Sequence, residues 1–167
     1  SSAITTGTGN SAVGYNSLLA TTTGLCNTTM GDNSLKSNTT GSFNSAFGRR
    51  ALCSNTSAND NTAVGYNSLC SNTTGCRNTT NGSLALLTNS TGDNNTGIGY
   101  GALYSNTTAD SNTAVGYQSM HLNTEGTRNT AVGTCSLRSN TTASDNTAFG
   151  FDSLKSNTTG NTNTAVG

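Results

Sequence analysis

Polar and apolar residues repeat with a period of 17 residues, without a slip from Asn10 to Gly167. With asparagine as column one of the period, column five is always glycine and column nine is always leucine or methionine. Column four is an aliphatic or aromatic residue in all coils but one. The asparagines of column one are Asn10, Asn27, Asn44, Asn61, Asn78, Asn95, Asn112, Asn129, Asn146 and Asn163. A fixed period without insertions predicts identical units that stack on one another.

The unit is clearest at residues 61–77, which read N-T-A-V-G-Y-N-S-L-C-S-N-T-T-G-C-R. A unit this short, rich in Thr, Val, Gly and Asn, does not suit a helical hairpin. It suits two or three short strands joined at Gly and Asn corners. We therefore expect an all-β fold, a parallel β-solenoid, as one domain over residues 1–167. The predicted full coils are 10–26, 27–43, 44–60, 61–77, 78–94, 95–111, 112–128, 129–145 and 146–162, with partial coils at 1–9 and 163–167.

Two apolar columns are expected to face inward, column four and column nine, beside small residues in columns three, eight and fifteen. Their spacing fits a three-sided coil, and a flatter two-sided roll fits nearly as well. Asn81 interrupts column four, which predicts a bulge or register shift within 78–94. The asparagines of column one are expected to form an amide ladder, each side chain bonding to the next coil at a corner.

The composition is unusual for a globular domain, with 31% hydrophobic residues, 8% charged residues and zero net charge. Disordered chains tend to carry high net charge, whereas periodic placement of Asn, Thr and Gly favours an ordered stack. Neutrality gives no electrostatic basis for nucleic-acid binding, and no apolar run approaches the roughly 20 residues that cross a bilayer. Opposite charges one period apart predict ion pairs between Asp60 and Arg77 and between Arg128 and Asp145.

Few residues offer chemistry. Cys53 and Cys70 share column ten, where neighbouring coils about 4.8 Å apart would allow a disulfide; two separate thiols are the alternative. Asp93 and Asp110 share column sixteen and are weak candidates for a calcium site, or else exposed carboxylates. His121 is the only histidine, in a variable column, so no catalytic constellation is evident. We expect no enzymatic activity and no cofactor.

Column twelve is a candidate site of N-glycosylation, because it carries a series of N-x-[ST] sequons. Glycans on every coil would be crowded, and the alternative is a turn stabilised by an Asn/Thr ladder. The sequons of column twelve begin at Asn38, Asn55, Asn72, Asn89, Asn106, Asn140 and Asn157, and others begin at Asn27, Asn78, Asn81 and Asn94.

The run Asn-Thr-Ala-Val-Gly occurs at 61–65, 112–116, 129–133 and 163–167. It resembles the repeats of YadA-type trimeric autotransporter adhesin heads and the N-T-A-V-G-Y arrays of tail-fibre proteins. The resemblance covers essentially all of 10–167. It implies a left-handed parallel β-roll, surface display and a role in attachment.

The leading expectation is a non-enzymatic extracellular structural protein at a cell or virion surface, a rigid shaft or filament subunit. Its expected partners are copies of itself, end to end or as a lateral trimer, because neither terminus resembles a solenoid cap. The alternative is an adhesin or tail-fibre module that binds surface glycans or proteins. A minor alternative is ice binding, which requires outward Asn and Thr in columns twelve and fourteen.

Overall fold

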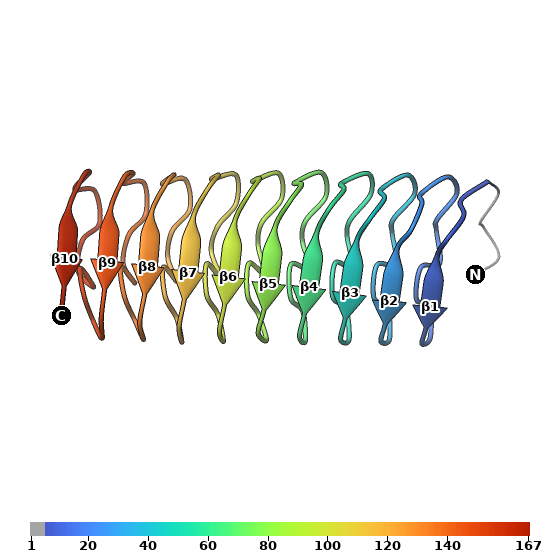
Figure 1. The fold of residues 1–167 in the computed structure, drawn as a ribbon, viewed down its shortest axis with the longest axis horizontal. Coiled ribbons are helices and arrows are strands. Elements are labelled where there is room, and N and C mark those ends of the chain that lie inside the picture. Colours follow the sequence, from blue (N-terminus) through green and yellow to red (C-terminus); the bar gives the residue numbers. More distant parts are fainter. Residues whose placement is uncertain (1–5) are drawn as a thin grey trace.

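The structure, a computed structural model, describes residues 6–167 as a stack of coils that form a straight rod (Figure 1). Each coil contributes one strand to a single ten-stranded parallel sheet in sequence order. The strands are β1 (Ser11–Val13), β2 (Thr28–Met30), β3 (Ser45–Phe47), β4 (Thr62–Val64), β5 (Thr79–Asn81), β6 (Thr96–Ile98), β7 (Thr113–Val115), β8 (Thr130–Val132), β9 (Thr147–Phe149) and β10 (Thr164–Val166). Residues 1–5 of the predicted first partial coil lie outside the described residues.

The predicted parallel β-solenoid is confirmed, but the predicted two or three strands per coil are wrong. Each coil has one strand of three residues, and the rest of the coil consists of turns and bends. These turns are nevertheless bonded along the axis. For example, Leu69 N–H donates to the Ala85 carbonyl at 2.9 Å and Ser71 N–H to the Leu87 carbonyl at 3.1 Å. The turns therefore stack with the same period as the strands.

Left-handed backbone conformations make the corners of each coil. Columns seven, nine and seventeen have positive φ in coil after coil, including the buried Leu103 with φ of 53°. This conformation is unfavourable for a leucine and costs about 1–2 kcal/mol. Column five requires glycine: at Gly99 φ is 122°, and a Cβ would lie 2.5 Å from the carbonyl oxygen of Gly116 in the next coil. The unbroken glycine column thus follows from how closely the coils approach.

The core is thinner than the sequence suggested. The column-nine side chains from Leu18 to Leu137 are fully buried and pack against the small residues of columns three and eight. Column four is not part of the core, and the prediction that it faces inward is wrong. Because side chains alternate along a strand, the buried Ala of column three sends columns two and four to the outside. A one-strand coil has room inside for only one large apolar side chain.

The predicted irregularity in 78–94 is absent. β5 pairs in register with both neighbours, so that Val64 lies opposite Asn81 and Asn81 opposite Ile98. Asn81 is exposed, and a polar side chain is tolerated in column four because the column faces outward. Among residues 6–167 no helix has the length and apolar character needed to span a bilayer. The left-handed sense of the coil, implied by the resemblance, stays a prediction.

Candidate functional site

The predicted asparagine ladder of column one is present and continuous. At each step the backbone N–H of one asparagine donates to the side-chain Oδ1 of the asparagine one coil before it, as in Asn95 to Asn78 at 2.9 Å and Asn112 to Asn95 at 3.0 Å. The side-chain amide also donates to a column-fifteen carbonyl of its own coil, as Asn95 Nδ2 does to Ala109 at 2.8 Å. These buried amides therefore have partners on both sides.

Column twelve forms a second buried amide ladder, which the sequence offered only as the alternative to glycosylation. Asn106 Nδ2 donates to Asn89 Oδ1 at 2.8 Å and to the Ala109 carbonyl at 3.0 Å. The side chains of Asn38, Asn55, Asn72, Asn89, Asn106 and Asn140 are fully buried, and Asn157 is half-buried. A glycan on any of these amide nitrogens would replace the ladder bonds and displace the neighbouring coil. Of the remaining sequons, Asn81 and Asn94 are exposed, whereas Asn27 and Asn78 are buried.

The two amide ladders meet at column fifteen. The Ala109 carbonyl accepts one bond from Asn95 and one from Asn106, so both of its lone pairs are used. The Gly92 carbonyl likewise accepts one bond from the Asn78 side-chain amide and one from the Asn89 side-chain amide. One side of the rod interior is therefore a hydrogen-bonded amide lattice, and only the other side is apolar.

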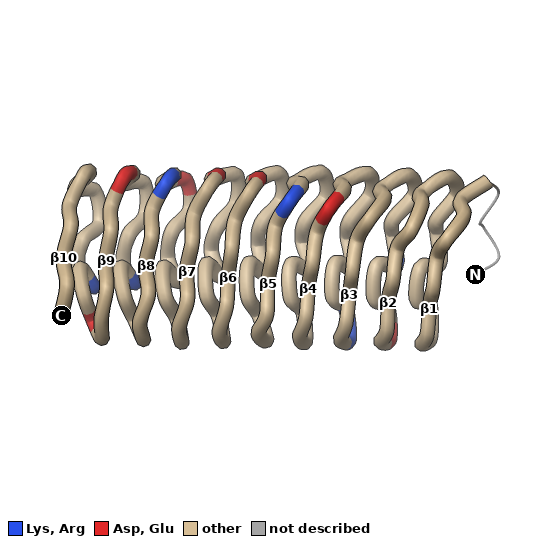
Figure 2. Tube along the Cα trace, viewed as in Figure 1, with Lys and Arg blue, Asp and Glu red and all other residues tan. Residues whose placement is uncertain are grey.

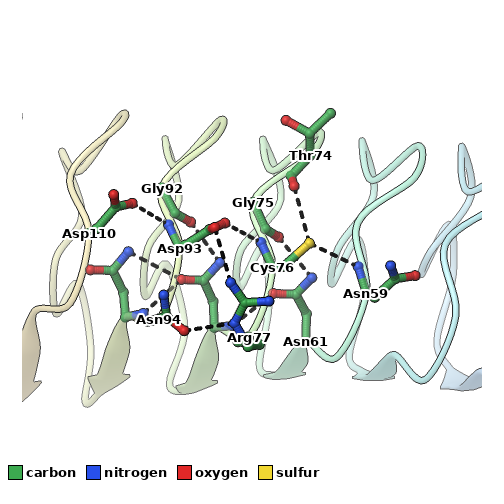
Figure 3. A network of polar contacts seen from close by, with 12 residues as sticks. Asn59, Asn61, Thr74, Gly75, Cys76, Arg77, Gly92, Asp93, Asn94 and Asp110 are labelled. Atoms are coloured by element: carbon green, nitrogen blue, oxygen red, sulfur yellow. Dashed lines mark hydrogen bonds and ion pairs between the residues drawn. The ribbon is translucent and has the colours of Figure 1, made fainter.

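Column sixteen forms a third polar ladder, at the edge of the rod (Figure 3). Asp110 Oδ1 accepts the Asp93 backbone N–H at 2.6 Å, and Asp93 Oδ1 accepts that of Cys76 at 2.7 Å. Asp93 Oδ2 also contacts Arg77 Nη2 at 3.3 Å. The candidate calcium ligands Asp93 and Asp110 are thus stacked as predicted, and each binds backbone of the preceding coil. Within residues 6–167 no group of three or more His, Cys, Asp or Glu side chains is placed to hold a metal ion.

One of the two predicted inter-coil ion pairs is present. Arg128 holds Asp145 through Nε–Oδ1 at 2.7 Å and Nη2–Oδ2 at 2.9 Å. These hydrogen bonds from Arg128 lower the pKa of the Asp145 carboxyl below its usual value. The predicted Arg77–Asp60 ion pair is wrong. Arg77 instead contacts Asp93 and Asn94 of the following coil, 78–94 (Figure 3).

The outer face of the strands carries the large apolar side chains. We call columns two, four and six the strand face. Its column-four and column-six members include Val13, Met30, Phe47, Ile98, Phe149 and Val166, and Tyr15, Tyr66, Tyr100, Tyr117 and Phe151, all of them exposed. Exposures such as 75% for Tyr15 and 70% for Phe151 are high for aromatic residues. A contiguous exposed apolar surface of this kind is typical of an interaction site.

Side chains on the strand face contact one another along the axis. The rings of Tyr100 and Tyr117 stack with centroids 5.6 Å apart and planes 13° apart. Arg49 bonds Asp32 at 3.2 Å and lies over the Tyr66 ring at 5.7 Å. These contacts hold column six as an ordered row of aromatic and polar groups. The strands themselves carry no charged residue, and charge gathers at the coil edges (Figure 2).

The sequence already contained a signal for this face. Column three is always small, Ala, Thr or Gly, and it follows a hydroxyl residue and precedes a large apolar one in every coil except 78–94. Successive side chains of a strand point to opposite faces, so either column three or columns two and four can be buried. A coil this short has room inside only for the small residues of column three. Hydrophobicity alone predicts burial of column four, and this alternation is the reason that the prediction is wrong.

Column ten lies on another side of the rod and also forms axial contacts. The Tyr104 and His121 rings stack at 4.8 Å, and His121 Nδ1 lies 2.9 Å from the Gly101 carbonyl. Cys53 and Cys70, in the same column, are free thiols on neighbouring coils. The Cys70 thiol and the Arg50 guanidinium lower the pKa of Cys53 to about 6. The neighbouring Cys53 thiol and burial raise the pKa of Cys70.

The ice-binding alternative required Asn and Thr of columns twelve and fourteen on one outer face. Column twelve is buried and only column fourteen is exposed, as in Asn106 and Thr108, so this paired face does not exist. Over residues 6–167 the surface has no pocket.

Comparisons with known proteins identify no relative. No protein family matches the chain, and neither a curated protein nor a solved structure is significantly similar to it.

Proposed function

We propose that this protein is a non-enzymatic structural protein, a rigid β-solenoid shaft that works outside the cell or on a virion surface. The observation that carries the proposal is the unbroken axial bonding. Backbone bonds, two buried amide ladders and the column-sixteen ladder all join neighbouring coils along the same axis. Nine steps of about 4.8 Å between ten strands make a rod about 43 Å long between β1 and β10.

The bonding supports stiffness for a physical reason. Bending the rod must stretch bonds on its convex side, and every side of the coil carries axial bonds. The strands, the turns after column eight and the column-one corner are each bonded to the next coil at about 3 Å, as Thr96, Leu103 and Asn112 show. A solenoid held only by its sheet would bend more easily about the unbonded side.

We further propose that the strand face is where shafts associate laterally with copies of themselves. The face spans about 13 Å across columns two to six and about 43 Å along the axis, roughly 600 Å² in plan. A stable interface buries about 800 Å² of accessible surface per partner, which a rugged face of this size approaches. Its strands are uncharged, and its only two charges, Asp32 and Arg49 in column six, are paired with each other, so the face has no net charge.

A second copy fits this face better than an unrelated partner because of its period. Side-chain rows recur once per coil over the whole sheet, from Val13 to Val166. Another copy has rows at the same spacing, so that ridges of one can settle between ridges of the other along the full length. A surface without that repeat would match only a few coils.

The test combines electron microscopy with sedimentation velocity on the purified chain. We expect straight rods and a concentration-dependent lateral assembly. Val115→Lys, which places a charge on β7, should shift the assembly to single rods. The matched control Thr108→Lys adds the same charge on exposed column fourteen and should leave assembly unchanged. Curved or flexible particles would contradict the shaft, and wild-type monomers at all concentrations would contradict lateral association.

A second candidate function, attachment to surface glycans, is favoured by the aromatic row of column six. Tyr100 and Tyr117 are about half exposed and stack on each other along the axis. Aromatic rings of this kind can stack on sugar rings. A glycan array probed with wild type and with the Tyr100→Ala, Tyr117→Ala double variant tests it: binding by the wild type alone supports attachment, and no binding by the wild type rejects it.

A further inference from the structure

Column ten places two thiols next to each other on successive coils, and no part of the proposed shaft function uses them. Ser54 N–H donates to the Cys70 carbonyl at 3.0 Å, so the two cysteines are held in register by the backbone. Strand-like neighbours lie about 4.8 Å apart, inside the Cα range of about 4.4–6.8 Å that a disulfide accepts. The Tyr104 and His121 rings of the same column, 4.8 Å apart, show that column-ten side chains project in parallel.

Arg50 is the third member of this cluster. It lies in column seven of the Cys53 coil, and its positive charge interacts with the Cys70 and Cys53 thiols. Column-seven and column-ten groups of neighbouring coils meet elsewhere in the rod too, as where Arg138 Nε donates to Gln118 Oε1 at 3.2 Å. A cation beside a thiol favours its thiolate form, which is the nucleophile in thiol chemistry.

The two thiols differ in access. Cys53 is half-buried, whereas Cys70 is only 5% exposed. An external reagent therefore meets Cys53 first, and Cys70 is reached only from Cys53. The Cys70 thiol and the Arg50 charge lower the pKa of Cys53, which favours its thiolate form.

We propose that Cys53, Cys70 and Arg50 form a thiol–disulfide exchange site that reacts with low-molecular-weight disulfides and locks two adjacent coils together. The Cys53 thiolate attacks a sulfur of the small disulfide and expels one thiolate, leaving a mixed disulfide on Cys53. Cys70 then loses its proton to solvent and attacks the Cys53 sulfur, expelling the second thiolate. Two protein thiols are oxidised, and the small disulfide is reduced to two thiols, which take up the two protons.

Arg50 is a positioning residue in this scheme, because it holds the Cys53 thiolate and takes no part in bond exchange. The product bridge joins the third and fourth full coils, 44–60 and 61–77. It cross-links the chain across one period of the repeat, so it should raise the unfolding midpoint of the rod.

The experiment incubates the reduced full chain with glutathione disulfide at pH 7 and maps the cysteines by alkylation and peptide mass spectrometry. We expect a Cys53–Cys70 linked peptide, with Cys26, Cys76 and Cys135 still alkylated. Cys70→Ser should stop at the Cys53–glutathione mixed disulfide. Cys53→Ser should slow the reaction of Cys70 by at least about tenfold.

Arg50→Gln is compared with its neighbour Arg49→Gln, whose guanidinium instead contacts Asp32 and Tyr66. Only Arg50→Gln should slow Cys53 modification and move its pH midpoint upward from near 6. Circular dichroism verifies that each variant keeps its fold. The proposal is overturned if exposed Cys26 reacts before Cys53 in the wild type, if the bridge joins other cysteines, or if both arginine variants behave alike.

Discussion

The amide lattice inside the rod and the apolar strand face outside it invert the usual arrangement of a protein. Asn95 and Asn106 are fully buried, whereas Ile98 and Tyr100, a few residues away in the same coil, are exposed. Amides that bond one another along an axis satisfy every polar group without water. A thin coil can therefore bury polar residues at little cost, provided that every coil carries the same residue, and large apolar groups are left for the surface.

The largest expected effect compares a buried with an exposed apolar side chain. Leu103→Ala should lower the free energy of unfolding by about 3 kcal/mol, because it leaves a cavity in a fully packed column. Ile98→Ala on the strand face should change it by less than about 0.5 kcal/mol in single rods. Urea titration monitored by circular dichroism measures both. Equal losses would mean that the strand face belongs to the core.

The next effect tests the amide lattice. Asn95→Ala removes the acceptor of the Asn112 N–H and should cost about 2 kcal/mol, since a buried donor loses its partner. Exposed Asn81→Ala, in column four of β5, is the matched control and should cost little. Hydrogen exchange gives the local readout: the Asn112 amide should lose protection, and amides several coils away should keep theirs. Unchanged protection at Asn112 would show that the ladder bond is not what holds this corner.

A smaller effect separates backbone strain from burial. Leu84 has φ of 62° in column seven, where asparagine stands in three other coils, so Leu84→Asn should stabilise by about 0.5 kcal/mol. Leu87 is half-buried as well but has no positive φ, so Leu87→Asn should destabilise. Thermal unfolding midpoints compare the two. A loss at both positions would mean that apolar contact outweighs the backbone conformation in column seven.

The smallest effect concerns the exposed Arg128–Asp145 ion pair. The folded pKa of Asp145 lies below its unfolded value of about 4, so the pair's contribution is complete above that value and is lost as pH falls through the folded pKa. Arg128→Ala should return the Asp145 pKa to the ordinary range, as NMR titration of the carboxyl would show. The unfolding midpoint at neutral pH should hardly move, because exposed ion pairs contribute little.

Much of this architecture could be predicted from periodicity. The parallel stack, the column-one ladder and the Arg128–Asp145 pair each follow from residues that recur or complement each other one period apart. The predicted Arg77–Asp60 pair is wrong because the next coil offers Asn94 in the same column and Asp93 in column sixteen. Sequence spacing does not say toward which end of the rod a long side chain turns. For column twelve the sequence left both glycosylation and an Asn/Thr ladder open, because a sequon and a ladder have the same letters, and the structure contains the ladder.

The sequence by itself determined that the chain stacks in register, because a 17-residue period without insertions leaves only one way to align every coil with the next. Only the tertiary structure decided which columns of side chains point into the rod and which point to solvent. With one short strand per coil, the interior has room for a leucine, small residues and flat amides. Column four was therefore forced outward, and the asparagines of column twelve inward, although hydrophobicity alone predicts the reverse.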